Sequence, residues 1–246
     1  MRRIVRTEAV ILRCRDWRES SRTVTLFTPD TGLVAVIARG SRRPRSRTAA
    51  ALNLFAHSRV IYYRHEARAL YNLSDAELIT AHSAIAQLPE RYFCAGRMAD
   101  FLLHALHPHD ANERLYGLLL ANLAVLEHAG DAFPALLAAF LLKAASFLGF
   151  RPELRRCVAC RRSVANKPAW FDPLRGGAVC RDCATGPSLR PVTAPELADL
   201  DRLLRTPTVE VAGLGVQSDA LAPVLEFLGA HFERMPVHEL AWPATP

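Results

Sequence analysis

Four cysteines have the spacing of a metal site. Cys157 and Cys160 are separated by two residues, as are Cys180 and Cys183, and nineteen residues lie between the two pairs. Each Cys-x-x-Cys turn can offer two thiolates to one ion, and four thiolates complete a tetrahedral zinc site at about 2.3 Å. Because four cysteines leave no position for water or substrate, we expect one structural Zn²⁺ that stabilises a small module and takes no part in catalysis.

Unrelated thiols or a disulfide pair are the alternatives to metal binding at these cysteines. The other two cysteines, Cys14 and Cys94, stand apart in the chain and are expected to be small buried apolar residues. The chain has no disulfide framework of the secreted type, which predicts a reducing, cytoplasmic compartment.

Its longest uncharged runs, 115–126 and 132–142, are shorter than the eighteen or so residues of a membrane span, so we expect no membrane partner.

A second chemical feature is the basic segment 39–47, which reads R-G-S-R-R-P-R-S-R. It has no acidic residue, and guanidinium groups bind phosphate oxygens in a bidentate manner. Gly, Pro and Ser predict an open loop after an expected strand at 33–38. A basic loop that contacts nothing is the alternative, but on a barrel we favour nucleic-acid binding. The candidate DNA-binding residues are Arg39, Arg42, Arg43, Arg45 and Arg47.

Positive charge is concentrated in two parts of the chain. Residues 1–80 hold fifteen arginines and seven acidic residues, and residues 151–190 hold nine basic and three acidic residues, within an overall net charge of +7. Such a concentration is typical of a protein that binds a polyanion, with ordinary solvated surface as the alternative. The arginines near the cysteines have two candidate roles, which are to neutralise the thiolates or to contact DNA.

Signatures of enzymes are missing from the sequence. It contains none of the patterns GxxxxGK[ST], G-x-S-x-G and HExxH, and its nine histidines do not form a second metal-ligand spacing. We therefore expect a protein without catalytic residues, without a bound organic cofactor and without a small-molecule substrate.

The basic segment belongs to a part of the chain that reads as short strands, at 7–13, 23–28, 33–38, 59–64 and 69–73. Pro29-Asp30-Thr31-Gly32 predicts a turn, so residues 23–38 should form a hairpin. Five short strands fit an N-terminal OB-fold β-barrel at 1–80, although an SH3-like barrel has a similar pattern. Most aromatic residues here should be core, and some could stack on unpaired bases. They are Trp17, Phe27, Phe55, Tyr62, Tyr63 and Tyr71.

The remainder, 81–246, is predicted to be an all-helical domain, which makes the chain an α+β multidomain protein. Ser74 and Glu77 have the spacing of a capping box, as do Thr193 and Glu196, and each predicts the start of a helix. Further helices are expected at 90–106, 112–129 and 132–148, the last capped by Asp131. Residues 151–189 form the inserted four-cysteine zinc module, which could not build a core without metal.

The order of these parts resembles the bacterial RecO family of recombination-mediator proteins. The resemblance lies in residues 7–13 and 19–28, in residues 38–47, which contain the basic segment, in the stretch L-Y-N-L-S-D-A-E at 70–77, and in the four cysteines. It covers nearly the whole chain, and the order of the pieces is more specific than any one of them.

This resemblance implies a non-enzymatic function in DNA repair. Proteins similar to RecO bind single- and double-stranded DNA through the OB barrel and anneal complementary strands. With RecR they help load RecA onto strands coated by the single-stranded-DNA-binding protein, whose acidic C-terminal tail contacts the helical region. The implied location is the nucleoid in the cytoplasm. The alternative from the residues themselves is a zinc-stabilised OB-fold scaffold that binds only RNA or protein partners.

Overall fold

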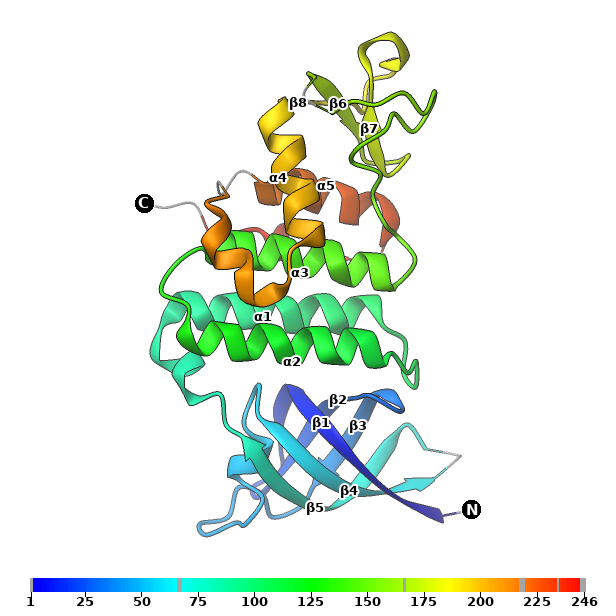
Figure 1. The fold of residues 1–246 in the computed structure, drawn as a ribbon. Helices are drawn as coiled ribbons and strands as arrows, with labels where there is room; N and C mark the ends of the chain where they lie inside the picture. The colour runs from blue at the N-terminus through cyan, green and yellow to red at the C-terminus, as the bar shows by residue number, and fades with distance from the viewer. Residues whose placement is uncertain (1, 66–67, 166, 217–219, 234, 244–246) are drawn as a thin grey trace. The chain divides into compact units, whose positions relative to one another are not determined.

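The computed structural model describes residues 2–65, 68–165, 167–216, 220–233 and 235–243. The chain forms two compact units, Met1–His128 and Ala129–Pro246. The first contains a β-barrel and two helices, and the second contains further helices and a small sheet (Figure 1).

A closed barrel of five strands opens the first unit. The strands are β1 (Arg2–Trp17), β2 (Ser21–Thr28), β3 (Gly32–Ala38), β4 (His57–His65) and β5 (Leu70–Thr80). Their order around the barrel is β1-β2-β3-β5-β4; β1 pairs with both β2 and β4, and β3 runs parallel to β5. This five-stranded Greek-key closure confirms the OB fold over the SH3-like alternative.

Alternation along the strands produces the barrel core. In the β2–β3 hairpin, Val24 pairs with Val36 and Leu26 with Val34, and all four side chains point inward. The predicted hairpin is confirmed, with Thr28 opposite Gly32 at the turn. The 3₁₀ helix η1 (Ala50–Leu52) adds Ala51 and Leu52 to the same core, so it closes one end of the barrel.

The capping box predicted at Ser74 and Glu77 is wrong, because these residues lie inside β5. Ala76 pairs with Val60 and is buried, while Glu77 points outward and its carboxylate accepts from Arg59 on β4 at 3.1 Å. Strand pairing therefore overrides a local helix signal.

Two helices follow the barrel, α1 (Pro89–Ala105) and α2 (Glu113–His128), after the 3₁₀ helix η2 (Ser83–Gln87). Both helices are where the apolar periodicity predicts them. They lie along the barrel (Figure 1), where the ring of Tyr116 on α2 meets Phe27 at 5.7 Å between centroids. Their connection is tied to the β2–β3 hairpin, since His109 donates its backbone N–H to the Leu33 carbonyl at 3.2 Å.

The second unit consists of helices around a nearly all-apolar α3. Its elements outside the cysteine module are α3 (Phe133–Phe147), α4 (Ala194–Arg205), η4 (Thr208–Leu214), α5 (Leu221–His231) and α6 (Val237–Leu240). The capping box of Thr193 and Glu196 is confirmed at the start of α4. The predicted cap of α3 by Asp131 is wrong, because the N-cap position is Ala132 in a left-handed conformation. Within the described residues, no helix combines the length and apolarity needed to cross a bilayer.

We expect Gly32→Ala to destabilise the first unit by about 2 kcal/mol or more. Gly32 has φ +71°, and a β-carbon there would overlap the backbone carbonyl of Asp110 in the α1–α2 connection. The matched control is Gly117→Ala in α2, where no atom lies within 4 Å of the new β-carbon; it should stabilise the helix by up to about 1 kcal/mol. Urea unfolding of both variants measures the difference, and equal stability of the two would contradict this packing.

Candidate functional site: a four-cysteine metal centre and a basic barrel loop

The cysteines lie in two tight turns beside a three-stranded sheet. The sheet has the order β7-β6-β8, from β6 (Ala169–Asp172), β7 (Gly177–Val179) and β8 (Arg190–Val192). In the first turn, Arg161 donates its backbone N–H to the Cys157 carbonyl at 2.9 Å. In the second, Cys183 ends the 3₁₀ helix η3 (Arg181–Cys183) and donates its N–H to the Cys180 carbonyl at 3.0 Å.

The four thiols converge as their spacing predicts. All four Sγ atoms lie within 4.8 Å of one another, and those of Cys160 and Cys180 are 3.7 Å apart. A tetrahedron with metal–sulfur distances of about 2.3 Å has sulfur–sulfur edges of about 3.8 Å. These four residues are therefore able to hold a metal ion, and the set matches the donor chemistry of a structural site.

The surroundings of the cysteines favour the thiolate at Cys157 and Cys160 but keep the proton on Cys183. The backbone N–H of Arg162, together with its guanidinium, lowers the pKa of Cys160 to about 6. Burial raises the pKa of Cys157, but hydrogen bonds from the backbone N–H groups of Cys160 and Cys180 outweigh it, and the pKa is lowered. Hydrogen bonds to Cys160 and Cys180 raise the pKa of Cys183 to about 12. A bound cation would relieve this competition for protons.

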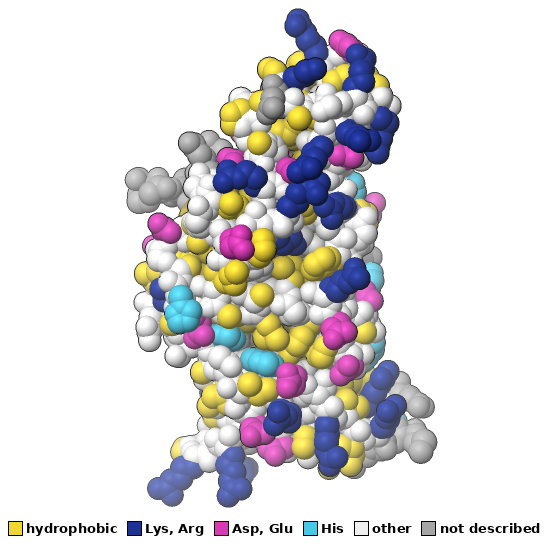
Figure 2. Space-filling view, viewed as in Figure 1, with side chains coloured by type: hydrophobic (Ala, Val, Ile, Leu, Met, Phe, Trp, Pro, Cys, Tyr) yellow, Lys and Arg dark blue, Asp and Glu magenta, His cyan; other side chains and the backbone are white. Residues whose placement is uncertain are grey.

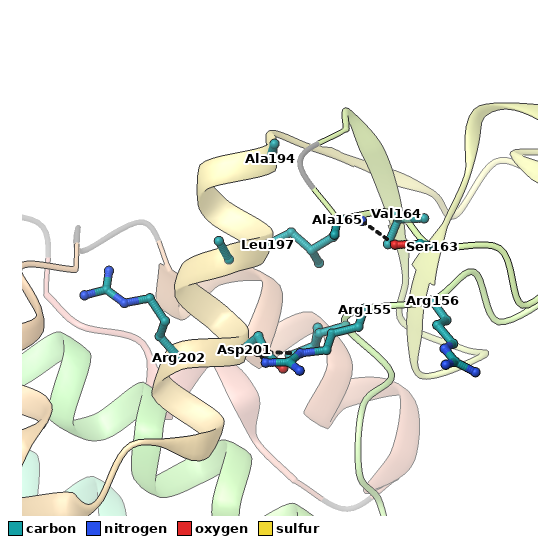
Figure 3. A pocket seen from close by; sticks show the side chains of 11 residues that line it. Arg155, Arg156, Ser163, Val164, Ala165, Ala194, Leu197, Asp201 and Arg202 are labelled. Carbon is teal, nitrogen blue, oxygen red and sulfur yellow. Dashed lines mark hydrogen bonds and ion pairs between the residues drawn. The ribbon is translucent and has the colours of Figure 1, made fainter.

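A cavity of about 480 Å³ separates the cysteine module from α4 (Figure 3). Its lining is mainly apolar, and the Arg155 guanidinium crosses it to Asp201 of α4 at 2.8 Å. Burial alone would raise the pKa of Asp201, but hydrogen bonds from Arg155 and Arg205 hold it below its ordinary value. Asp201 is thus an ionised anchor for the module and is poorly suited to proton transfer.

Most arginines of the module are already paired with carboxylates. Arg162 lies 3.0 Å from Asp182 and also donates to the Cys160 thiolate, which is the neutralising role expected around the cysteines. The other pairs are Arg155–Asp201, Arg161–Glu153, Arg175–Asp172 and Arg190–Glu226. Five of the nine basic residues at 151–190 thus have a carboxylate partner inside the unit, while Arg151, Arg156, Lys167 and Arg181 are exposed and have no ion pair among the described residues.

The arginines of the basic loop on the barrel, in contrast, are mostly without carboxylate partners among the described residues. All five candidate arginines are exposed, and Figure 2 shows Lys and Arg side chains projecting from the barrel into solvent. Arg42 has a side-chain partner within the described structure: its guanidinium lies 3.3 Å from Asp16 and donates to the Arg18 carbonyl at 3.2 Å. Among the described residues, the other four contact no carboxylate: Arg39, Arg43, Arg45 and Arg47.

Hydrogen-bonded turns hold the loop in place. Ser41 is buried and donates its hydroxyl to the Ala38 carbonyl at 2.9 Å. Arg43 donates its N–H to the Gly40 carbonyl at 3.1 Å, and Ser46 donates to Arg43 at 3.0 Å. The arginines are thus presented outward from an ordered backbone, an arrangement suited to binding phosphates.

Sequence comparison identifies the family to which these features belong. Residues 1–82 match the family described as "Recombination protein O N terminal", and residues 87–240 match "Recombination protein O C terminal". The chain belongs to the RecO family of DNA repair proteins. The RecO resemblance predicted from the order of the parts is therefore confirmed.

Two relatives illustrate the extent of the similarity to RecO. The chain is 33% identical over 231 residues to "DNA repair protein RecO" of Rubrobacter xylanophilus, covering 93% of this chain and 92% of the relative. It is 36% identical over 200 residues to the protein of the same name from Anaeromyxobacter sp. strain K, covering 81% and 78%. The similarity thus includes both the barrel and the cysteine module.

The barrel structure also shows which aromatic residues are accessible and which further arginines lie beside them. Phe27, Phe55, Tyr62 and Tyr71 are buried, whereas Trp17 is 45% exposed. The sequence interpretation did not single out Arg13, Arg15 and Arg18, which lie on β1 and directly after it. Arg13, Arg15 and Trp17 recur at every second position, and this alternation places them on one face of a strand.

We expect the RecO chain to contain one zinc ion, and Cys180→Ser to abolish its binding. Loss of the ion removes the folding free energy of the module, so backbone amides of β6, β7 and β8 should lose protection from hydrogen exchange while those of β1 to β5 keep it. Metal analysis and hydrogen exchange provide the two measurements. The control is Cys14→Ser on the barrel, which should retain a full zinc complement; less than half an ion per wild-type chain would contradict the assignment.

We expect Asp201→Asn to loosen the module in a pH-dependent way. Because the folded-state pKa of Asp201 is lowered, its stabilisation is complete above the ordinary aspartate pKa and is lost as pH falls through the folded-state value. The variant should lower the free energy of unfolding by about 1 kcal/mol near pH 7, with a shrinking deficit in acid. Urea unfolding across pH measures this, with Asp199→Asn on the same helix as control; a pH-independent deficit would rule out the ion pair as its cause.

Proposed function

We propose that this RecO-family protein is a non-enzymatic DNA-binding recombination mediator. It binds single- and double-stranded DNA, anneals complementary strands and, with RecR, helps load RecA onto strands coated by the single-stranded-DNA-binding protein. The basic loop on the OB barrel supports this proposal most directly, because four exposed arginines there have no carboxylate partner in the described structure. The protein acts at the nucleoid, in the cytoplasm.

The physical basis that we propose for annealing is neutralisation of phosphate charge. Two DNA strands repel each other through their phosphates, and each arginine that contacts a phosphate releases condensed counterions. The loop offers a dense cationic surface in which only Arg42 has a carboxylate partner among the described residues, so strands that lie against it can approach and pair without ATP. Zn²⁺ held by Cys157, Cys160, Cys180 and Cys183 has a structural role and contributes no chemistry to this process.

The salt dependence of DNA binding tests whether the loop arginines contact phosphates. Replacing Arg39, Arg43 and Arg45 together by alanine should weaken binding to any DNA sequence, and should reduce the slope of log affinity against log salt by up to about 2.7 for duplex DNA. Annealing of labelled complementary strands should slow in the same variant. Fluorescence anisotropy at several salt concentrations gives the slope.

A control with the same change in net charge isolates the position of these arginines. Arg59, Arg97 and Arg202 already pair with carboxylates, so replacing these three by alanine should leave the salt slope nearly unchanged. If the two triple variants lost the same slope, the loop would not be the binding surface.

Partner-dependent assays separate the mediator from a scaffold that binds only RNA or protein. The mediator anneals DNA, and with RecR it accelerates RecA assembly on strands coated by the single-stranded-DNA-binding protein. Binding of RNA in preference to DNA, together with failure to anneal, would support the scaffold instead.

A further inference from the structure

A β-bulge in β1 divides the outer face of the barrel into a buried apolar part and an open part that carries arginines. Ile11 pairs with Leu26 and Arg13 with Thr25, so Leu12 is an extra residue between the two pairs. A bulge shifts the alternation of the strand by one position. Beyond it, Cys14 packs against the core, and Arg13, Arg15 and Trp17 point outward.

Neighbouring strands divide this face into a covered half and an open half. Before the bulge, the face carries Val10, Phe27 and Leu33, which are buried; Phe27 meets Tyr116 of α2, and Leu33 bridges to the α1–α2 connection.

After the bulge, Arg13 and Arg15 lie opposite Thr25 and Thr23, whose partners on β3 are Ala35 and Ile37. The open half thus places Arg13 and Arg15 beside a strip of threonine and aliphatic side chains.

Trp17 is the exposed aromatic side chain of the open half. It is 45% exposed and makes no ring contact with the described part of the chain. Covering this indole with another flat ring is favourable, because apolar surface of both rings is removed from water.

The position of Trp17 connects this face to the basic loop. The hairpin at 18–20 follows Trp17 directly. The backbone N–H of Arg42 donates to the Ser20 carbonyl at 3.1 Å, and the Arg42 guanidinium donates to the Arg18 carbonyl at 3.2 Å. The indole therefore lies next to the loop whose arginines are proposed to bind phosphates.

We propose that this open half binds unpaired bases of single-stranded DNA, with Trp17 stacking on a base and Arg13 and Arg15 contacting phosphates of the same strand. Stacking on an aromatic side chain needs a base whose face is free, which a duplex does not offer. The inference rests on the proposed DNA binding and adds a division of roles: the loop arginines bind either form of DNA, and Trp17 recognises the single strand.

An affinity experiment separates the two roles. Trp17→Ala should weaken binding of oligo(dT) by about 5- to 150-fold, leave duplex affinity within about twofold, and leave the salt slope unchanged because no charge is lost. Trp17→Phe should recover most of the loss. The control is Tyr92→Ala on α1, a side chain of similar exposure (48%), which should bind both DNAs like wild type.

Substituting both β1 arginines tests the phosphate contacts. Arg13→Ala with Arg15→Ala should reduce the salt slope for oligo(dT) by up to about 1.4, since each contact to a single strand contributes about 0.7. An unchanged slope would remove both arginines from the site.

Fluorescence reports directly on the indole. Trp170→Phe with Trp242→Phe leaves Trp17 as the sole tryptophan of the chain. Its emission should be quenched on saturation with oligo(dT) and change little with duplex DNA at equal occupancy.

Binding of oligo(dT) without quenching, or an equal loss of single-strand and duplex affinity in Trp17→Ala, would overturn the stacking site while leaving the proposed function intact. Stronger quenching and affinity with single-stranded RNA would overturn the assignment to DNA, and a wild-type protein that binds no DNA would overturn the proposed function itself.

Discussion

Closure of the barrel depends on a short parallel pairing between β3 and β5, over three residue pairs from Ala35–Leu70 to Ile37–Asn72. Without it the sheet would have two open edges, and inward side chains such as the fully buried Tyr62 would be open to water. Parallel neighbours need a long crossover connection. Here that connection runs from Arg39 through η1 and β4, so the basic loop is part of the segment that closes the barrel. Because Ala51 and Leu52 anchor the far side of this loop in the core, its arginines are presented outward.

The two basic parts of the chain differ in how their charge is balanced. Five of the arginines at 151–190 face a carboxylate of their own unit, and the pairs of Arg155 and Arg190 link this part of the chain to α4 and α5. On the barrel loop, four arginines lie close in sequence and contact no carboxylate of the described residues. Such a cluster destabilises the isolated protein through self-repulsion, and a polyanion relieves that repulsion. The sequence counts both regions as basic, but unpaired arginines form a larger share of the barrel loop, with four of five, than of the basic residues at 151–190, where Arg151, Arg156, Lys167 and Arg181 have no ion pair among the described residues.

Two similar sequence patterns show what could be predicted and what could not. Thr193-Ala-Pro-Glu196 and Ser74-Asp-Ala-Glu77 both read as capping boxes, but only the first caps a helix. Its Pro195 lies in the first helical turn, where proline favours helix, and an amphipathic segment follows. The second pattern lies opposite β4, and pairing with that strand decides its conformation. The four cysteines could be predicted because their chemistry and spacing are local. The bulge at Leu12 could not, because it exists only relative to Leu26 and Thr25 on β2.

The structure of the cysteine module shows why a bound cation would stabilise it. Its sheet is only three short strands, and Gly177 must pass so close to the Glu153 carbonyl that a β-carbon there would lie 2.5 Å from it. Contacts with the helices supply part of the missing core, as where Phe171 meets Phe227 of α5 at 6.3 Å between centroids. These contacts fix the strands but not the two cysteine turns, whose thiolates repel one another. A cation bound to four sulfurs converts that repulsion into attraction. Arg162 donates to the Cys160 thiolate and lies 3.0 Å from Asp182, so it would neutralise part of the negative charge of four thiolates around such an ion from within the module.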